Sequence, residues 1–338
     1  MSAFANSNDV SGGVPPSAQV LQLATAHFVA RCLQVVATAG IADSVSDVPR
    51  PAKDIAAQVD VNADALHRML RLLATQGIFR FEGNGWVHTP ASALLRTDNP
   101  QSMRAFAAMM GDPVNLQSLE VLEYTLKTGD AGAHKVFPGG AWGYYSQHPQ
   151  MARQFDAAMT SKSQGDIPLL VGALDVANCK TIADIAGGRG HFLQAIVDAH
   201  PNLKGILFDQ PDVVANGQNH PRISKVGGDF FKGELPKADL YLMVHILHDW
   251  ADEECLAILR NLRAAAPKGA RLVVFELALP EGPEPHPAKL LDIIMLSITG
   301  GRERTAKEYA KLFASAGWAD DGVTLTPGPM ALHKARAA

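Results

Sequence analysis

The second half of the chain alternates short apolar segments of strand length with longer segments of helical periodicity. The alternating segments are Thr181–Ile185, His191–Ala199, Gly205–Phe208, Asp212–Asn216, Leu240–Val244, Glu253–Ala265, Arg271–Glu276, Leu290–Thr299 and Thr305–Ala316. Such alternation predicts a mostly parallel sheet that is covered by helices. Two further segments, Gly322–Thr326 and Pro329–Lys334, predict strands that extend the edge of this sheet in antiparallel fashion.

The first half of the chain has a different pattern, of helices with one hairpin. Residues 1–16 are rich in Asn, Ser, Gly and Pro and predict a flexible arm. A helix that is apolar on more than one side starts at Ser17, and it needs more than one partner surface, which is either the chain's own core or a second subunit. We therefore expect an arm, a helical unit over residues 17–165 and a sheet domain over residues 166–338.

A winged-helix arrangement is predicted within this helical unit. Residues 51–59 and 62–77 form a helix-turn-helix-like pair, and Glu82–Gly85 separates two short apolar segments as a hairpin turn does. Winged helices often bind DNA through a helix that is rich in cations. The candidate recognition helix offers only His67, Arg68 and Arg71. Packing or dimerisation is therefore the favoured role, and DNA binding by a ligand-sensing regulator is the alternative.

Composition narrows the class of protein. Of the 338 residues, 47% are hydrophobic, which is enough for a sizeable core. The net charge of -4 gives no basic field that would attract nucleic acid. No uninterrupted apolar run approaches the roughly 20 residues of a membrane helix, and the N-terminus lacks the pattern of a signal peptide. The three cysteines have no metal-binding or redox spacing. The sequence predicts a cytoplasmic protein without a metal, a membrane or a nucleic-acid partner.

Glycine and acidic residues gather where the first three strands are predicted to end. Asp184 precedes a turn that contains Gly187 and Gly188, as in loops that admit a nucleotide-like ligand close to the backbone. Asp209 ends the next strand, where an acid accepts hydrogen bonds from ribose hydroxyls. A role for Asp184 in bonding the amides of its own turn is the alternative to ligand contact.

The end of the third strand carries the sequence Gly228-Asp229-Phe230. There a carboxylate can meet the amino group of an adenine while the aromatic ring packs on the base. An ordinary turn with a helix cap is the alternative. All three strand ends are expected at the carboxyl edge of the sheet, where open α/β sheets bind their ligands.

A histidine follows the fourth strand. His248 is a candidate general base, because an imidazole with an ordinary pKa near 6.5 accepts a proton at neutral pH. Glu276, at the end of the next strand, and Glu303, in a later loop, are candidates to orient it. Asp249 is predicted to be the N-cap of the following helix, and Glu308 to complete a capping box with Thr305.

Taken in order, these motifs resemble those of S-adenosylmethionine-dependent O-methyltransferases of the caffeate and hydroxyindole type, in particular the bacterial branch that acts on aromatic natural products. The motifs are Asp184–Gly190, Phe208-Asp209, Gly228–Phe230, Leu247–Trp250 and Gly300–Thr305. The resemblance implies a Rossmann-like domain with a mostly parallel seven-stranded sheet and an antiparallel edge strand. It also implies a winged-helix dimerisation domain, a homodimer and methyl transfer to a phenolic hydroxyl.

The resemblance also implies roles for individual residues. His248, Glu276 and Glu303 would be catalytic, with His248 as the base. The residues expected at the cofactor are Ser163, Asp184, Gly187, Gly188, Asp209, Gly228, Asp229, Phe230 and His245, and those expected at the substrate are Phe155, Met159 and Met295. Ala186 stands where relatives often have glycine, and Val244 where plant relatives have lysine, so contacts to the cofactor are expected to differ there.

Other enzyme activities on this fold remain open at this point. Methyl transfer to nitrogen, or hydroxylation or decarboxylation on the same fold, would use the same cofactor site. A nicotinamide-dependent dehydrogenase is disfavoured because Leu193 occupies the third glycine position of the dinucleotide fingerprint.

Overall fold

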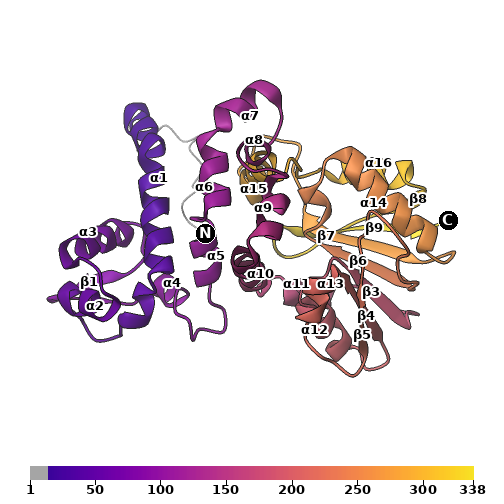
Figure 1. The fold of residues 1–338 in the computed structure, drawn as a ribbon, viewed down its shortest axis with the longest axis horizontal. Helices are drawn as coiled ribbons and strands as arrows, with labels where there is room; N and C mark the ends of the chain where they lie inside the picture. Colours follow the sequence, from indigo (N-terminus) through magenta and orange to yellow (C-terminus); the bar gives the residue numbers. More distant parts are fainter. Residues whose placement is uncertain (1–13) are drawn as a thin grey trace. The chain divides into compact units, whose positions relative to one another are not determined.

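The computed structural model describes residues 14–338, which divide into two units (Figure 1). Among these residues, the first unit comprises residues 14–116 and Gln150–Lys162, and the second Gln117–Pro149 and Ser163–Ala338. Most of the predicted flexible arm, residues 1–13, lies outside the described residues.

The first unit has the predicted helix pair and hairpin. α2 (Ala52–Val59) and α3 (Ala63–Ala74) precede the antiparallel strands β1 (Arg80–Glu82) and β2 (Gly85–Val87). Asn62 caps α3 by accepting a hydrogen bond from the backbone N–H of Ala65 at 2.9 Å. The apolar side of α3 is buried at Leu66, Leu70 and Leu73, as its periodicity predicts. The other helices here are α1 (Pro16–Thr38), η1 (Ile41–Ser44), α4 (Pro90–Ala93), α5 (Arg104–Met109), α6 (Pro113–Glu120) and α10 (Pro149–Ser163), of which α6 and α10 cross the unit boundaries.

The candidate recognition helix uses its histidine for packing. Nδ1 of His67 accepts a hydrogen bond from the indole N–H of Trp86 at 3.3 Å, and its ring packs on Phe81. Arg68 pairs with Asp64 of the same helix at 3.7 Å. This helix therefore presents few groups to a nucleic-acid backbone.

α1 exposes a large apolar surface within the chain. Val20, Leu21, Leu23 and Phe28 are 60–71% exposed. By length and composition α1 could also cross a membrane, since an 18-residue window has a mean hydropathy of 1.4 and is 11% buried. This finding qualifies the sequence prediction, which considered only uninterrupted apolar runs. The sequence of this helix left two partner surfaces open, the chain's own core and a second subunit. The core does not cover these four side chains. Exposed apolar surface of this kind is typical of a protein interface.

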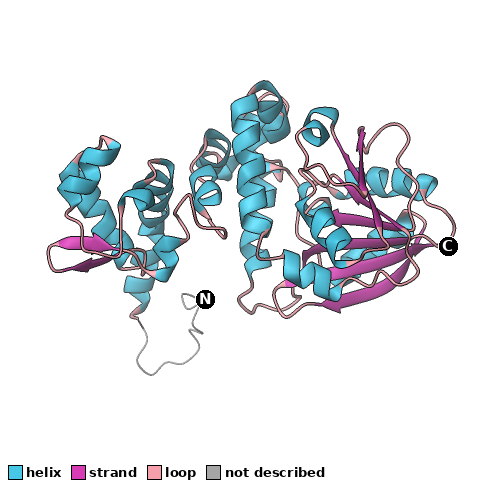
Figure 2. Cartoon of the chain, turned by 90° about the horizontal axis from the view of Figure 1, so that it is seen from below, coloured by secondary structure: helices cyan, strands magenta, loops and turns pink. Residues whose placement is uncertain are grey.

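The second unit is built on a seven-stranded sheet with helices on both faces (Figure 2). Its order is β5 (Ile223–Gly227), β4 (Lys204–Asp209), β3 (Thr181–Ile185), β6 (Leu240–Val244), β7 (Arg271–Leu277), β9 (Met330–Ala337) and β8 (Trp318–Leu325). The first five strands are parallel, and β9 pairs antiparallel with both β7 and β8. The predicted mostly parallel sheet with an antiparallel strand near one edge is confirmed.

Strand periodicity places alternate residues of the central strands in two cores. Tyr241 and Met243 pack with α14 (Asp252–Ala265) and α16 (Ala306–Ser315). Leu240 and Leu242 pack with residues of α12 (His191–Ala199) on the opposite face. The other helices of this unit are α7 (Leu122–Thr128), α8 (Gly132–Val136), α9 (Gly140–Gln147), α11 (Ile167–Ala173), α13 (Pro211–Ala215), η2 (Leu247–Asp249) and α15 (Pro287–Ile298).

Candidate functional site

The chain turns sharply at the carboxyl ends of the two central strands. Ala186, directly after β3, and His245, directly after β6, have left-handed backbone conformations with φ of 57° and 55°. This conformation is strained for residues other than glycine, by about 1–3 kcal/mol each, and such strain concentrates at functional sites. β3 and β6 are neighbours and lie where the strand order reverses, which is the position at which open α/β sheets bind ligands.

We expect the substitution Ala186→Gly to leave the free energy of unfolding unchanged or to raise it by up to about 1 kcal/mol, because relief of left-handed strain offsets the entropy lost by glycine. Ala257→Gly, at an exposed position in α14, is the matched control and should lower it by about 1 kcal/mol. Chemical denaturation measures both. Equal destabilisation by the two variants would contradict the assignment of strain to Ala186.

The glycine turn is held by the acid of the next strand. The carboxylate of Asp209 accepts a hydrogen bond from the backbone N–H of Gly188 at 2.8 Å. Gly188 has a φ of 59°, and a Cβ atom at Gly187 would overlap the carboxyl group of Asp184. The turn therefore requires glycine at both positions, and it leaves the backbone open to a ligand.

Asp184 is buried below this turn. It is 1% exposed, and neither carboxyl oxygen has a hydrogen-bond partner among the described residues. Burial, together with the nearby charge of Asp209, raises the pKa of Asp184 to about 8, so the group is mainly protonated at neutral pH. The alternative that Asp184 bonds the amides of its own turn is wrong, since Asp209 takes that role. Buried polar groups without a partner are unusual and indicate a ligand or water at that position.

Further polar groups at this edge form pairs. The hydroxyl of Ser163 lies 2.7 Å from Nε2 of His191, the first residue of α12. Burial lowers the pKa of His191 to about 4, so this imidazole is neutral. Nε2 of His245 lies 3.5 Å from the carboxylate of Asp166. His191 was missed from sequence, although its position directly after the glycine turn was a usable signal.

The third strand end forms a tight turn. The carboxylate of Asp229 accepts a hydrogen bond from the backbone N–H of Phe231 at 2.9 Å, which fits the turn alternative. A Cβ atom at Gly228 would lie 2.7 Å from the ring of Phe208, so no larger residue fits there. The ring of Phe230 contacts Trp250 edge-on, with ring centroids 5.8 Å apart. Ligand contacts by these residues stay predictions.

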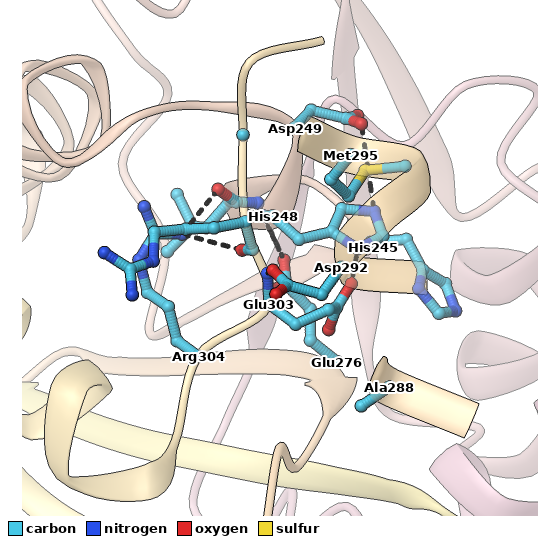
Figure 3. Close-up of polar contacts among 12 residues, drawn as sticks. His245, His248, Asp249, Glu276, Ala288, Asp292, Met295, Glu303 and Arg304 are labelled. Atoms are coloured by element: carbon cyan, nitrogen blue, oxygen red, sulfur yellow. Dashed lines mark hydrogen bonds and ion pairs between the residues drawn. The ribbon is translucent and has the colours of Figure 1, made fainter. Parts of the chain in front are cut away.

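The histidine of the fourth strand end lies on η2 (Figure 3). His248 is 5% exposed, and its Nδ1 lies 2.6 Å from a carboxylate oxygen of Glu303. Its Nε2 lies 3.9 Å from Asp249, beyond hydrogen-bond distance. Burial alone would lower the pKa of His248, but the hydrogen bond to Glu303 and the charges of Asp249, Glu276 and Glu303 raise it to about 9.

Glu276 is close to His248 but does not contact its ring in a hydrogen bond. One of its oxygens accepts the backbone N–H groups of Ile246, Leu247 and His248 at 2.9, 2.7 and 3.3 Å. The other accepts the hydroxyl of Tyr309. Burial alone would raise the pKa of Glu276, but the charge of His248 and the hydrogen bond from Tyr309 hold it below its usual value. The structure thus brings Glu303 to the ring and Glu276 to the backbone.

The capping predictions have mixed outcomes. Asp249 ends η2 and is not a helix cap, because α14 begins after Ala251, whose side chain cannot accept a hydrogen bond. The prediction failed because a 3-10 turn of three residues precedes the helix. The capping box of Thr305 and Glu308 at the start of α16 is confirmed.

The three predicted substrate residues lie on two helices. Met295 lies in the last turns of α15, is 8% exposed and is drawn with His248 and Asp249 in Figure 3. Phe155 and Met159 lie on the part of α10 that belongs to the first unit. All three stay predictions.

Comparison with known proteins gives matches over both units. Residues 120–319 match the O-methyltransferase domain family, and residues 21–98 match the O-methyltransferase dimerisation domain. The phenazine O-methyltransferase PhzM of Lysobacter antibioticus is 38% identical over 337 residues, covering 97% of this chain and 98% of that protein. The crystal structure of LaPhzM is similar with a TM-score of 0.90 at 38% identity, covering 96% of this chain and all (100%) of that one. CalO1, a methyltransferase in calicheamicin biosynthesis solved in its SAH-bound form, has a TM-score of 0.84 at 32% identity over 96% of this chain and 100% of that one.

Proposed function

The chain belongs to the O-methyltransferase family, and from that premise we propose that it methylates a phenolic hydroxyl of a small aromatic natural product, with His248 as the general base. The observation that carries the proposal is the hydrogen bond between Nδ1 of His248 and the carboxylate of Glu303 at 2.6 Å. This hydrogen bond occupies Nδ1, which leaves Nε2 as the nitrogen that we propose takes the proton of the acceptor.

The carboxyl edge of the sheet fits S-adenosylmethionine as the methyl donor. When bound, this group supplies a methyl on a positively charged sulfur, which is already activated for transfer. The buried carboxyl of Asp184, which has no partner among residues 14–338, suits a polar group of the methionine portion beside Gly187 and Gly188. The carboxylate of Asp209 accepts hydrogen bonds from the backbone N–H groups of Gly188 and Gln210 at 2.8 and 2.7 Å, which hold it at the strand end proposed for the ribose hydroxyls.

The remaining predicted cofactor residues are assigned from their places at the same edge. Asp229 and Phe230, at the end of the third strand, are proposed for the adenine, with Gly228 allowing the close turn. Ser163 and His245 are proposed as further contacts. Their present partners, His191 and Asp166, hold both side chains in place at the sheet edge.

The raised pKa of His248 suits a phenolic acceptor. A phenol such as that of tyrosine has a pKa of about 10, so its proton moves to an imidazole of pKa about 9 at a cost of only about 1.4 kcal/mol. The same transfer to an imidazole of ordinary pKa, about 6.5, costs about 5 kcal/mol. The carboxylate of Glu303 stabilises the imidazolium that forms.

The acceptor class is tested directly by transfer of a labelled methyl group. A panel of hydroxyphenazines, aminophenols, simple phenols and aromatic amines is incubated with deuterium-labelled methyl donor, and products are identified by mass spectrometry. We expect the label on the hydroxyl oxygen of the hydroxyphenazines, because the chain is similar to a phenazine O-methyltransferase. Label on nitrogen alone, or none on any hydroxyl, would contradict it.

A homodimer is supported by the dimerisation-domain match and by the exposed apolar side chains of α1. We expect the double substitution Leu21→Asp and Phe28→Asp to convert the dimer to monomers at micromolar concentration, because both apolar side chains would be covered by the partner. Sedimentation velocity measures the change. Leu325→Asp on β8, where leucine is 70% exposed, is the control and should leave the dimer intact. An unchanged sedimentation coefficient in the double variant would contradict this role of α1.

A further inference from the structure

Two buried charged side chains hold the backbone around the proposed base, one through its N–H groups and the other through its carbonyl groups. We call residues 246–250 the histidine turn. Its N–H groups at Ile246, Leu247 and His248 donate to Glu276, which is fully buried. Its carbonyl groups at Leu247 and Trp250 accept from the guanidinium of Arg304 at 2.9 and 2.8 Å.

Arg304 is itself fixed in place. It is 1% exposed, and the carboxylate of Asp252 accepts two of its N–H groups at 3.0 and 2.7 Å. Burying a charge is costly unless hydrogen bonds satisfy it. Arg304 satisfies its donors on the histidine turn and on Asp252, so its geometry and that of the turn are set together.

The residues just before Arg304 also contact the histidine turn. The backbone N–H of Arg302 donates to the carbonyl of His248 at 2.9 Å. The side chain of Glu303 meets the imidazole (Figure 3). A Cβ atom at Gly301 would overlap the backbone of the turn. The N–H of Glu303 donates to Asp292 of α15 at 2.9 Å. Residues 301–304 thus all contact the histidine turn, and among these four Glu303 is the one that bonds the imidazole ring.

We propose that Arg304 is a positioning residue for methyl transfer, whose guanidinium holds the carbonyl groups of the histidine turn so that Nε2 of His248 stays aligned with the acceptor oxygen. This inference rests on the proposed function. A misplacement of about 1 Å at a reacting group can cost about 10²-fold in rate, so groups that act only through the backbone of the turn can have large effects. A substitution of Arg304 that keeps its charge tests this role apart from the charge of Glu276, which acts on the titration of His248.

The substitution Arg304→Lys keeps the charge but loses the planar fork that reaches two carbonyls. With 1-hydroxyphenazine, or otherwise the panel acceptor with the highest turnover, we expect kcat to fall by about 10–10²-fold. The affinity for S-adenosylhomocysteine, the acceptor KM and the pH midpoint of kcat should each stay close to those of the parent protein.

Arg222→Lys is the matched control. Arg222 donates to the carbonyls of His200, Pro201 and Leu203 at 3.0, 3.2 and 3.1 Å, at the amino end of β5 and so away from the site. It should lower the melting temperature without a selective fall in kcat. If Arg304→Lys does not fold, Asp252→Asn is the second variant, because it weakens the ion pair that fixes the same guanidinium. The side chain of Asp252 is 57% exposed, so we expect a smaller fall in kcat, of about 3–10-fold.

A second readout does not depend on the acceptor. The Nδ1 proton of His248, shared with Glu303, should give a proton NMR resonance far downfield of the amides, which His248→Gln abolishes. Arg304→Lys or Asp252→Asn should shift or broaden it, and Arg222→Lys should leave it unchanged. Normal kcat and an unchanged resonance in both the Arg304 and Asp252 variants would overturn the inference. If His248→Ala is fully active, the proposed base itself is wrong, and that result is distinct from failure of the positioning role.

Discussion

Replacement of His248 by alanine is expected to lower kcat by about 10²–10⁴-fold, the usual contribution of a positioned general base. The loss arises because the acceptor must then give its proton to water. Binding of S-adenosylhomocysteine should change by no more than about twofold, since the imidazole acts on the acceptor and not on the donor. Steady-state kinetics and isothermal titration calorimetry measure the two effects separately.

His220→Ala is the control for this prediction. Nε2 of His220 pairs with the carboxylate of Asp198 at 3.0 Å, so it is also a histidine with an acidic partner, but it lies outside the site. It should retain nearly full turnover. A His248→Ala protein with kcat within about tenfold of the parent would remove the imidazole from the base role.

The substitution Glu303→Gln is expected to move the pH profile of kcat/KM to lower pH. The carboxylate helps to raise the pKa of His248 to about 9, and the neutral imidazole is the active form. The parent rate should therefore rise about tenfold per pH unit and level off near pH 9. Without the negative charge the imidazolium is less stable, so the pKa of His248 falls and the midpoint moves toward about 6.5.

The same substitution should also lower the plateau. A base with a lower pKa accepts the proton of a phenol less readily, and each unit is worth about 1.36 kcal/mol of driving force. We expect the limiting kcat/KM to fall by about tenfold or more. Glu308→Gln is the control, because Glu308 caps α16 and does not contact the imidazole. A midpoint in Glu303→Gln that equals the parent's, or lies above it, would contradict the electrostatic role of Glu303.

Much of the fold could be predicted from the sequence, because its signals are local. The bounds of Thr181–Ile185 and Leu240–Val244 agree with β3 and β6, since continuous apolar runs of five residues suit strands that are covered on both faces. The positions of Asp209 and His248 at strand ends were also predictable, because parallel strands end at one edge. The insertion of β9 between β7 and β8 depends on long-range pairing, which no local pattern specifies.

The details of the site were less predictable, since they depend on which groups meet in space. Glu276 was identified by its place after an apolar run, yet nothing in the sequence indicates that it bonds three backbone N–H groups. Arg304 was missed as a functional residue, although it follows directly after Glu303 in a motif that was noted. Asp249 was assigned to a helix cap because Asp is a common N-cap, and the short 3-10 turn that displaces the helix start has no clear sequence signal.

The central claim is that Nε2 of His248 takes the proton of the acceptor's hydroxyl. A crystal structure of the protein with S-adenosylhomocysteine and a methylatable acceptor tests it most directly, through the distance between Nε2 and the acceptor oxygen. The account predicts about 2.6–3.2 Å, with Nδ1 still bonded to Glu303. An acceptor oxygen that is bound by another residue, with the imidazole out of hydrogen-bond reach, would contradict it.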